Sequence, residues 1–259
     1  MMFEKAKPHN LAKALSILLV GLFFSTTFTG CWTSKAEKQY LLAKPHYEAS
    51  LAYSREGKIA RAKEEVLLAI EAYPEYTEAH IFYQTIRAGE VEPKELLGEY
   101  DRLLKQNQDN PRFHFLYGRL LGDIEKQEAV YERAIQLDEQ CPWNYFGLGW
   151  VAFKRSDYDK AVDYFKKCID IAPDNPLFHN DLGGVYYFMG MYEEAIAELS
   201  VARDVDPLYP AAYANLATAY YQRGDFDMAV EMLEEYLRLY PAAKDAPEIE
   251  RKLVQLRGK

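Results

Sequence analysis

The sequence predicts an all-α fold in which helix hairpins stack one after another as an α-solenoid, and three observations carry this prediction. Prolines close three successive blocks of the 259-residue chain at 34-residue spacing, at Pro173, Pro207 and Pro241. Within each block apolar residues follow i, i+3, i+4, i+7 spacing, which places them on one side of a helix. Self-similarity at a fixed period of about 34 residues is the signature of stacked repeats, each of which buries its apolar side against its neighbour.

The first thirty residues differ in composition from the rest. Lys5, Lys7 and Lys13 precede an apolar run over residues 14–24, and small and hydroxyl residues follow up to Cys31. This order is typical of a secretory signal peptide, which we expect at residues 1–30. An uncleaved membrane anchor is the alternative, although the apolar run is shorter than the ~20 residues of a spanning helix.

The end of this leader, Phe28-Thr29-Gly30-Cys31, resembles the lipobox of bacterial lipoproteins, except that the family prefers Leu where Phe28 stands. An ordinary signal peptide that happens to be followed by a cysteine is the other interpretation. The resemblance implies that Cys31 becomes the first mature residue and carries a covalent lipid, with no other cofactor. Because Trp32 rather than Asp follows Cys31, the resemblance favours the outer membrane of a bacterial envelope, facing the periplasm.

The charge balance argues against a nucleic-acid partner. The whole chain has a formal net charge of −9, and removal of residues 1–30, with their three Lys and one Glu, brings it to −11. Nucleic-acid binding depends on a Lys/Arg surface that neutralises phosphates. We therefore expect no nucleic acid among the partners.

The repeated blocks share more than their closing proline. Leu182-Gly183 and Ala195 in one block match Leu216-Ala217 and Ala229 in the next. These motifs resemble the tetratricopeptide repeat (TPR), which implies a right-handed α-solenoid of six TPR helix hairpins plus a C-terminal capping helix. The small residues allow the two helices of a hairpin to approach closely. Gly190 and Gly224 fall where each first helix ends, and a left-handed helix end favours Gly.

The repeat register divides the whole chain. We expect a lipidated Cys and a short tether at 31–42, six repeats over 43–243 and a capping helix at 244–259. The repeats are expected at 43–76, 77–110, 111–141, 142–175, 176–209 and 210–243. The second repeat keeps only part of the pattern, and the third lacks three residues between its helices. Since these segments take up all 259 residues, and no phosphate loop or nucleophile motif is present, we predict no enzyme and no catalytic residue.

The resemblance also implies a concave groove, lined by fixed positions of each first helix, that binds a protein or extended peptide. Aromatic residues, which dominate binding hot spots, occupy many of these positions. The predicted groove residues are Tyr47, Phe115, Trp143, Phe146, Trp150, Phe153, Tyr187, Phe188, Asn215 and Tyr221. The alternative for Trp143 and Trp150 is that they fill an irregular junction with the shortened third repeat. Asn215 matches one position of the carboxylate-binding TPR domains, but the basic residues Lys44 and Arg112 lie in distant repeats, so the full clamp is absent.

Histidines and cysteines are the remaining candidates for chemistry. His46, His80, His114 and His179 occupy one equivalent position in four repeats, and neighbouring stacked helices, ~8–10 Å apart, hold such side chains too far apart to share an ion. We therefore predict packing roles and no metal site. Cys141 lies just before the first helix of one hairpin, and Cys168 lies toward the end of its second helix. Because the two helices run antiparallel, these two places lie near each other, so a disulfide is geometrically conceivable in an oxidising envelope.

A membrane-anchored scaffold that recruits a protein or peptide in its groove is the leading functional hypothesis. Among known families, a six-repeat lipoprotein of this length looks like the pilotins that deliver secretins of type IV pili to the outer membrane. It is also similar to periplasmic TPR lipoproteins that dock peptidoglycan enzymes. Three alternatives stay open, namely the pilotin-like role, a self-associating structural protein of the envelope, and an accessory subunit of an enzyme complex. Repeat consensus reports the fold rather than the partner.

Overall fold

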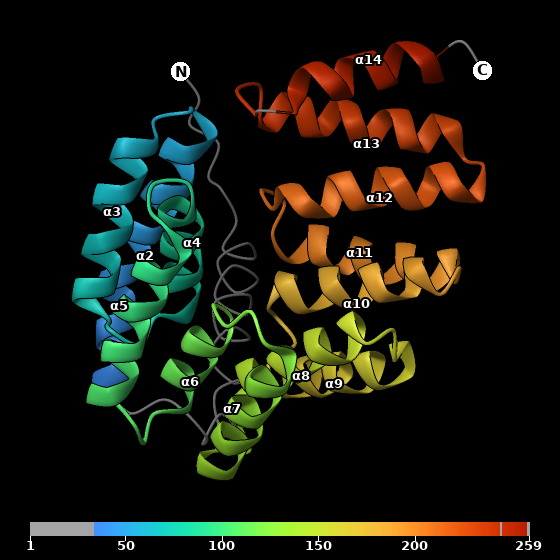
Figure 1. Cartoon of the computed structure of the whole chain (residues 1–259). Helices are drawn as coiled ribbons and strands as arrows, with labels where there is room; N and C mark the ends of the chain where they lie inside the picture. The colour runs from blue at the N-terminus through green and yellow to red at the C-terminus, as the bar shows by residue number, and fades with distance from the viewer. Residues whose placement is uncertain (1–33, 244, 258–259) are drawn as a thin grey trace, which may run out of the picture.

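The computed structural model describes residues 34–243 and 245–257, and the predicted signal peptide and Cys31 lie outside them. Over these residues the chain forms thirteen helices and no strand, which confirms the all-α TPR solenoid (Figure 1). The helices are α2 (Ser34–Arg55), α3 (Ile59–Ala72), α4 (Thr77–Ala88), α5 (Pro93–Gln106), α6 (Pro111–Gly118), α7 (Ile124–Leu137), α8 (Pro142–Lys154), α9 (Tyr158–Ile171), α10 (Pro176–Phe188), α11 (Tyr192–Val205), α12 (Pro210–Arg223), α13 (Phe226–Leu239) and α14 (Ala246–Leu256). None of the helices in this part of the chain is both long and apolar enough to cross a bilayer.

Each predicted repeat contains two antiparallel helices, and small residues set how closely the two approach. A Cβ added to Gly183 of α10 would stand 2.7 Å from Leu199 Cγ and 3.1 Å from the Ala195 carbonyl oxygen of α11. Between neighbouring repeats, a Cβ on Gly147 of α8 would stand 2.6 Å from the Tyr131 ring of α7. All three distances are shorter than ordinary van der Waals contact, so glycine is the residue that fits at these crossings.

Left-handed residues end the first helix of several hairpins, as predicted. Gly190 has φ +76° and Gly224 has φ +95°, a backbone region that favours glycine. Ser156 takes the equivalent place after α8 with φ +62°. The sharp turn that follows brings the second helix back along the first.

The N-terminal helix begins before the first predicted repeat. We expected a short tether at residues 31–42 and the first repeat from residue 43; in the structure α2 begins at Ser34, so residues 34–42 form the first turns of this helix. Two reasons account for this: Ala, Lys, Glu, Gln and Leu dominate the segment and are strong helix formers, and the helix has a surface to pack on. Ala43 is fully buried, and the Tyr40 ring lies 5.4 Å from Tyr76 in an edge-to-face arrangement.

The array curves until its two arms come into contact. In Figure 1, α2–α5 form one arm and α10–α14 the other, with α6–α9 between them. Asn175 Nδ2 in the second arm donates a hydrogen bond of 3.4 Å to Glu78 Oε1 in the first. A Cβ added to Gly57 would stand 3.7 Å from Ala242 Cβ. The inner side of the superhelix is therefore a confined space rather than an open trough.

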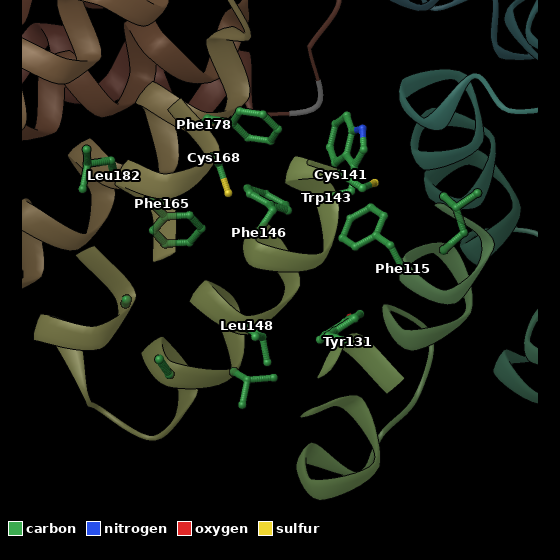
Figure 2. Close-up of a cluster of buried hydrophobic side chains, with 14 of the residues drawn as sticks. Phe115, Tyr131, Cys141, Trp143, Phe146, Leu148, Phe165, Cys168, Phe178 and Leu182 are labelled. Atoms are coloured by element: carbon green, nitrogen blue, oxygen red, sulfur yellow. The ribbon is translucent and has the colours of Figure 1, made fainter. Parts of the chain in front are cut away.

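Aromatic rings form the core of the central part of the array, from α6 to α10. Figure 2 shows the Trp143 ring among Phe115, Phe146 and Phe178, with ring centroids 5.3, 5.9 and 5.1 Å away. These rings come from α6, α8 and α10, so one continuous apolar cluster holds three successive repeats together. Edge-to-face and tilted pairs of this kind add ~0.5–1.5 kcal/mol each beyond the area that they bury.

Candidate protein-binding groove

A cavity of about 440 Å³ opens on the inner side of the superhelix. Its walls come almost entirely from the first helix of successive hairpins, together with α7 of the shortened third repeat. The lining residues are Ile81, Phe115, Arg119, Gln127, Tyr131, Phe146, Gly147, Trp150, Lys154, Leu177, Asn180, Asp181, Tyr209 and Ala211. They span the second to the sixth repeat, so the curvature of the whole array creates the cavity.

Three of the predicted groove residues line this cavity. Trp150 is 39% exposed, and its indole Nε1 donates a 2.9 Å hydrogen bond to Asp181 Oδ2, which fixes the ring. Phe115 and Phe146 lie beneath it as a buried floor. The structure thus separates the predicted aromatic set into an accessible wall and a structural base.

Trp143 does not take the role predicted for it. Its side chain is 4% exposed and is packed among the core rings of Figure 2. The predicted groove position is therefore wrong for this residue, and the filling role that we gave as the alternative describes it. The physical reason is the neighbouring repeat: α6 is only eight residues long, and the Trp143 indole fills the space beside Phe115 at this junction.

A second aromatic group forms an accessible rim next to the cavity. Phe153 lies 5.4 Å from the Trp150 ring and 5.0 Å from the Phe188 ring, and Tyr187 lies 5.6 Å from Phe188. Phe188 is 60% exposed, which is unusual for a phenylalanine. These four residues, Trp150, Phe153, Tyr187 and Phe188, are called the aromatic rim below. Clustered exposed apolar side chains of this kind mark interaction sites.

The other predicted groove residues are not brought to this place. Tyr47 packs against Tyr76 in the first hairpin, with ring centroids 5.0 Å apart. Tyr221 packs against Phe226, with ring centroids 5.5 Å apart. Asn215 Nδ2 on α12 donates a 2.9 Å hydrogen bond to Asn180 Oδ1 on α10, so it supports a cavity residue from the first helix of the following repeat.

Sequence reasoning missed the polar residues of the cavity. Arg119 and Lys154 bring positive charge to it, and Asp181 brings a carboxylate. Burial raises the pKa of Asp181 to about 6, against the opposing effect of the hydrogen bonds from Asn180 and Trp150. Burial also lowers the pKa of the Arg119 guanidinium from its ordinary value. No local signal marks these residues, because the residues that surround them come from several different repeats.

Comparison with known proteins decides the family. Residues 116–141, 143–175 and 177–242 each match a tetratricopeptide repeat model. The chain is a tetratricopeptide-repeat protein. Such arrays are scaffolds for protein–protein interaction, because their curvature creates an extended concave surface.

Three relatives show how far the similarity of this TPR protein extends. The type IV pilus assembly protein PilF of Pseudomonas aeruginosa is 27% identical over 168 residues, which cover 60% of this chain and 64% of PilF. The mitochondrial import receptor subunit TOM70 of Rattus norvegicus is 24% identical over 138 residues, 52% of this chain and 22% of TOM70. The crystal structure of the APC/C hetero-tetramer Cut9-Hcn1 has a TM-score of 0.58 and 20% identity, covering 85% of this chain and 46% of that one. This chain thus spans less than two thirds of each of the three.

The histidines of the TPR array make structural hydrogen bonds. His80 Nε2 bonds the Pro74 carbonyl oxygen at 2.9 Å, His114 Nε2 the Gln108 carbonyl at 2.7 Å, and His179 Nε2 the Pro173 carbonyl at 2.9 Å. The Tyr213 hydroxyl, at the same repeat position, donates to the Pro207 carbonyl at 2.9 Å. In each case the partner lies six residues earlier, in the turn between repeats. The residues from 34 to 257 that the structure describes contain no group of three His, Cys, Asp or Glu side chains suited to a metal ion.

Both cysteines of the described chain keep their thiols, so the conceivable disulfide is not formed in the structure. Cys168 is fully buried, and its Sγ donates to the Pro142 carbonyl at 3.3 Å. Burial raises the pKa of this thiol well above its usual range. A buried protonated thiol behaves as a small apolar side chain, which fits its place in the core.

Proposed function

We propose that this TPR protein is a membrane-anchored scaffold that recruits a protein or an extended peptide in the concave cavity and against the aromatic rim. The observation that carries the proposal is the rim itself, where Trp150 and Phe188 stay exposed beside a cavity built from five repeats. Tryptophan and other aromatics contribute most to binding when they are held rigidly in place. The hydrogen bond between Trp150 and Asp181 holds the indole in this way.

The anchor in this proposal is a lipid on Cys31, and the location is the bacterial envelope, at the outer membrane facing the periplasm. Similarity to PilF, a protein of type IV pilus assembly, supports an envelope location. Because α2 begins at Ser34, three residues after Cys31, the array stands directly at the membrane surface rather than at the end of a long tether. Partners are therefore other proteins of the same envelope.

A role in type IV pilus assembly is the second candidate, and the 27% identity to PilF favours it specifically. In the pilotin-like version of this role the partner is a secretin subunit. Deletion of the chain's gene is then expected to leave secretin monomers in place of multimers. Normal secretin multimers in the deletion strain would remove this candidate while leaving the scaffold proposal intact.

Site-specific photocrosslinking in living cells tests the scaffold proposal. A photoreactive phenylalanine analogue replaces Phe188 in the aromatic rim, and in a matched strain it replaces Val201, which is 40% exposed on α11, a helix that contributes nothing to the cavity. We expect a discrete crosslinked species from position 188 and none from position 201. Equal crosslinking from both positions, or none from either, would contradict the proposal.

A further inference from the structure

Two cations in the cavity are held by amides rather than by carboxylates. Arg119 Nη1 donates a 2.7 Å hydrogen bond to Gln84 Oε1. Lys154 Nζ donates a 3.1 Å hydrogen bond to Gln127 Oε1. Both cations line the same cavity, and both contacts join residues of adjacent repeats.

The two glutamines are built into the fold in the same way. Gln84 is 3% exposed and its Nε2 donates to the Leu116 carbonyl at 2.9 Å; Gln127 is 4% exposed and its Nε2 donates to the Leu121 carbonyl at 2.6 Å. Each amide nitrogen is thereby fixed to the backbone, and each amide oxygen is turned toward a cation. The side chains are oriented without any neutralisation of the charge.

The pattern differs from that of other cations in this chain. Arg155, directly after Lys154, pairs with Glu128 at 2.8 Å and with Glu125 at 3.8 Å. Throughout the part of the chain that the structure describes, neither Arg119 nor Lys154 has a carboxylate within ion-pairing distance. A shortage of carboxylates does not explain this, because the chain carries 40 Asp and Glu against 31 Lys and Arg.

The cavity's own carboxylate has other partners. Asp181 accepts hydrogen bonds from Trp150 Nε1 at 2.9 Å and from Asn180 Nδ2 at 2.8 Å. It therefore orients the tryptophan of the aromatic rim and forms no direct ion pair with either cation, although its charge acts on that of Arg119 across the cavity. Each cation now donates to a neutral amide oxygen, so an anion that joined Arg119 and Lys154 would add a direct charge–charge attraction that the amides do not supply.

We propose that Arg119 and Lys154 bind an acidic side chain of the partner, carried on a segment whose neighbouring apolar residues pack on the aromatic rim. Trp150 and Lys154 are four residues apart on α8 and so share one face of this helix. A partner with an Asp or Glu beside an apolar residue matches this face. The inference rests on the proposed scaffold function and names the chemistry that the groove selects.

Matched peptide pools test the inference on the full chain. Three pools of short, N-acetylated peptides of random Ala, Ser, Leu and Phe are offered to the immobilised protein. One pool has a central Glu and an amidated end, one has a central Gln and an amidated end, and one has a central Gln and a free C-terminal carboxylate. Mass spectrometry measures recovery. We expect recovery of the Glu pool to exceed that of the Gln amide pool by roughly ten-fold.

Pairs of variants that each lose one positive charge show which residues cause the preference for Glu. Lys154→Gln is expected to remove most of the preference for Glu, whereas Arg155→Gln, which removes the same charge one residue away, leaves it intact. Arg119→Gln and its surface control Arg133→Gln form a second pair, with circular dichroism showing that each variant is folded. Lys154 is exposed, so the first pair stays informative even if Arg119→Gln disturbs the fold.

The outcomes separate the two proposals. Equal recovery of the Glu and Gln amide pools would overturn the acidic-residue inference while leaving peptide binding by the groove in place. Preferential recovery of the pool with the free C-terminus would overturn it in favour of a terminal carboxylate. Failure to recover any pool would count against both the inference and the groove as a peptide site.

Discussion

The histidines at the equivalent repeat position give a prediction that can be worked through in numbers. His80 is 3% exposed, and burial lowers its pKa from 6.5 to about 4. Its Nε2 bonds the Pro74 carbonyl, which requires a proton on Nε2, and its Nδ1 lies 3.0 Å from the Tyr100 hydroxyl, which donates to it. This arrangement uses the neutral imidazole, so protonation is disfavoured in the folded state.

The sign and size of the change in the free energy of unfolding with pH follow from the linkage between protonation and folding. Because the folded pKa lies below the unfolded one, the unfolded chain binds the proton more readily, and the free energy of unfolding falls as the pH drops below about 6.5. The full difference between the two pKa values corresponds to about 3 kcal/mol, reached near pH 4 and below. Between about pH 7 and about pH 5 the loss from His80 alone is about 2 kcal/mol.

Urea unfolding followed by far-UV circular dichroism, at both pH values, measures this loss. The control is His80→Gln, which keeps one donor and one acceptor but does not titrate. The wild type is expected to lose about 2 kcal/mol more than the variant on acidification. Equal losses for the two proteins would refute the assignment of a buried neutral His80.

His179 provides the opposite case at the same repeat position. Its Nδ1 lies 2.8 Å from Glu198 Oε2, and this hydrogen bond raises the pKa of His179 above its ordinary value. The folded pKa now exceeds the unfolded one, so the stabilisation is complete below the unfolded pKa and disappears as the pH rises through the folded pKa. Compared with His179→Gln, the wild type is expected to gain stability on acidification. A loss relative to the variant would contradict the ion pair.

Three further predictions concern packing and the anchor. Gly147→Ala places a Cβ 2.6 Å from the Tyr131 ring and is expected to lower the free energy of unfolding by about 1–3 kcal/mol, as measured in urea. Unchanged stability would contradict this close contact. Trp143→Ala is expected to lower the free energy of unfolding by about 3–5 kcal/mol, because it leaves a cavity in the core. Trp150→Ala is expected to leave the helical circular dichroism intact and to weaken crosslinking from the aromatic rim. Equal destabilisation by both variants would contradict the division between core and rim. Cys31→Ser is expected to abolish incorporation of a labelled fatty acid and release the protein from the membrane fraction, and labelling that persists would exclude Cys31 as the lipid site.

The sequence by itself determined the repeats, their helices and their close approaches. Gly183 opposite Ala195 and the left-handed Gly190 and Gly224 were all predicted, and the structure confirms them. These features are local, because the spacing of apolar and small residues within one hairpin decides which faces of its two helices meet. The fold class follows once such hairpins recur at a fixed period.

Only the tertiary structure decided which residues of the inner face reach solvent. Trp143 and Trp150 stand on one helix and looked equivalent, yet the first is 4% exposed and the second 39%. Arg119 in the cavity bonds Gln84, which lies 35 residues earlier in the sequence. Where the two arms meet, Asn175 bonds Glu78, which lies 97 residues earlier. Such placements depend on the curvature that accumulates over successive interfaces between repeats. No single repeat encodes that curvature, so the pattern of one hairpin specifies its core but not the surface that the whole array offers to a partner.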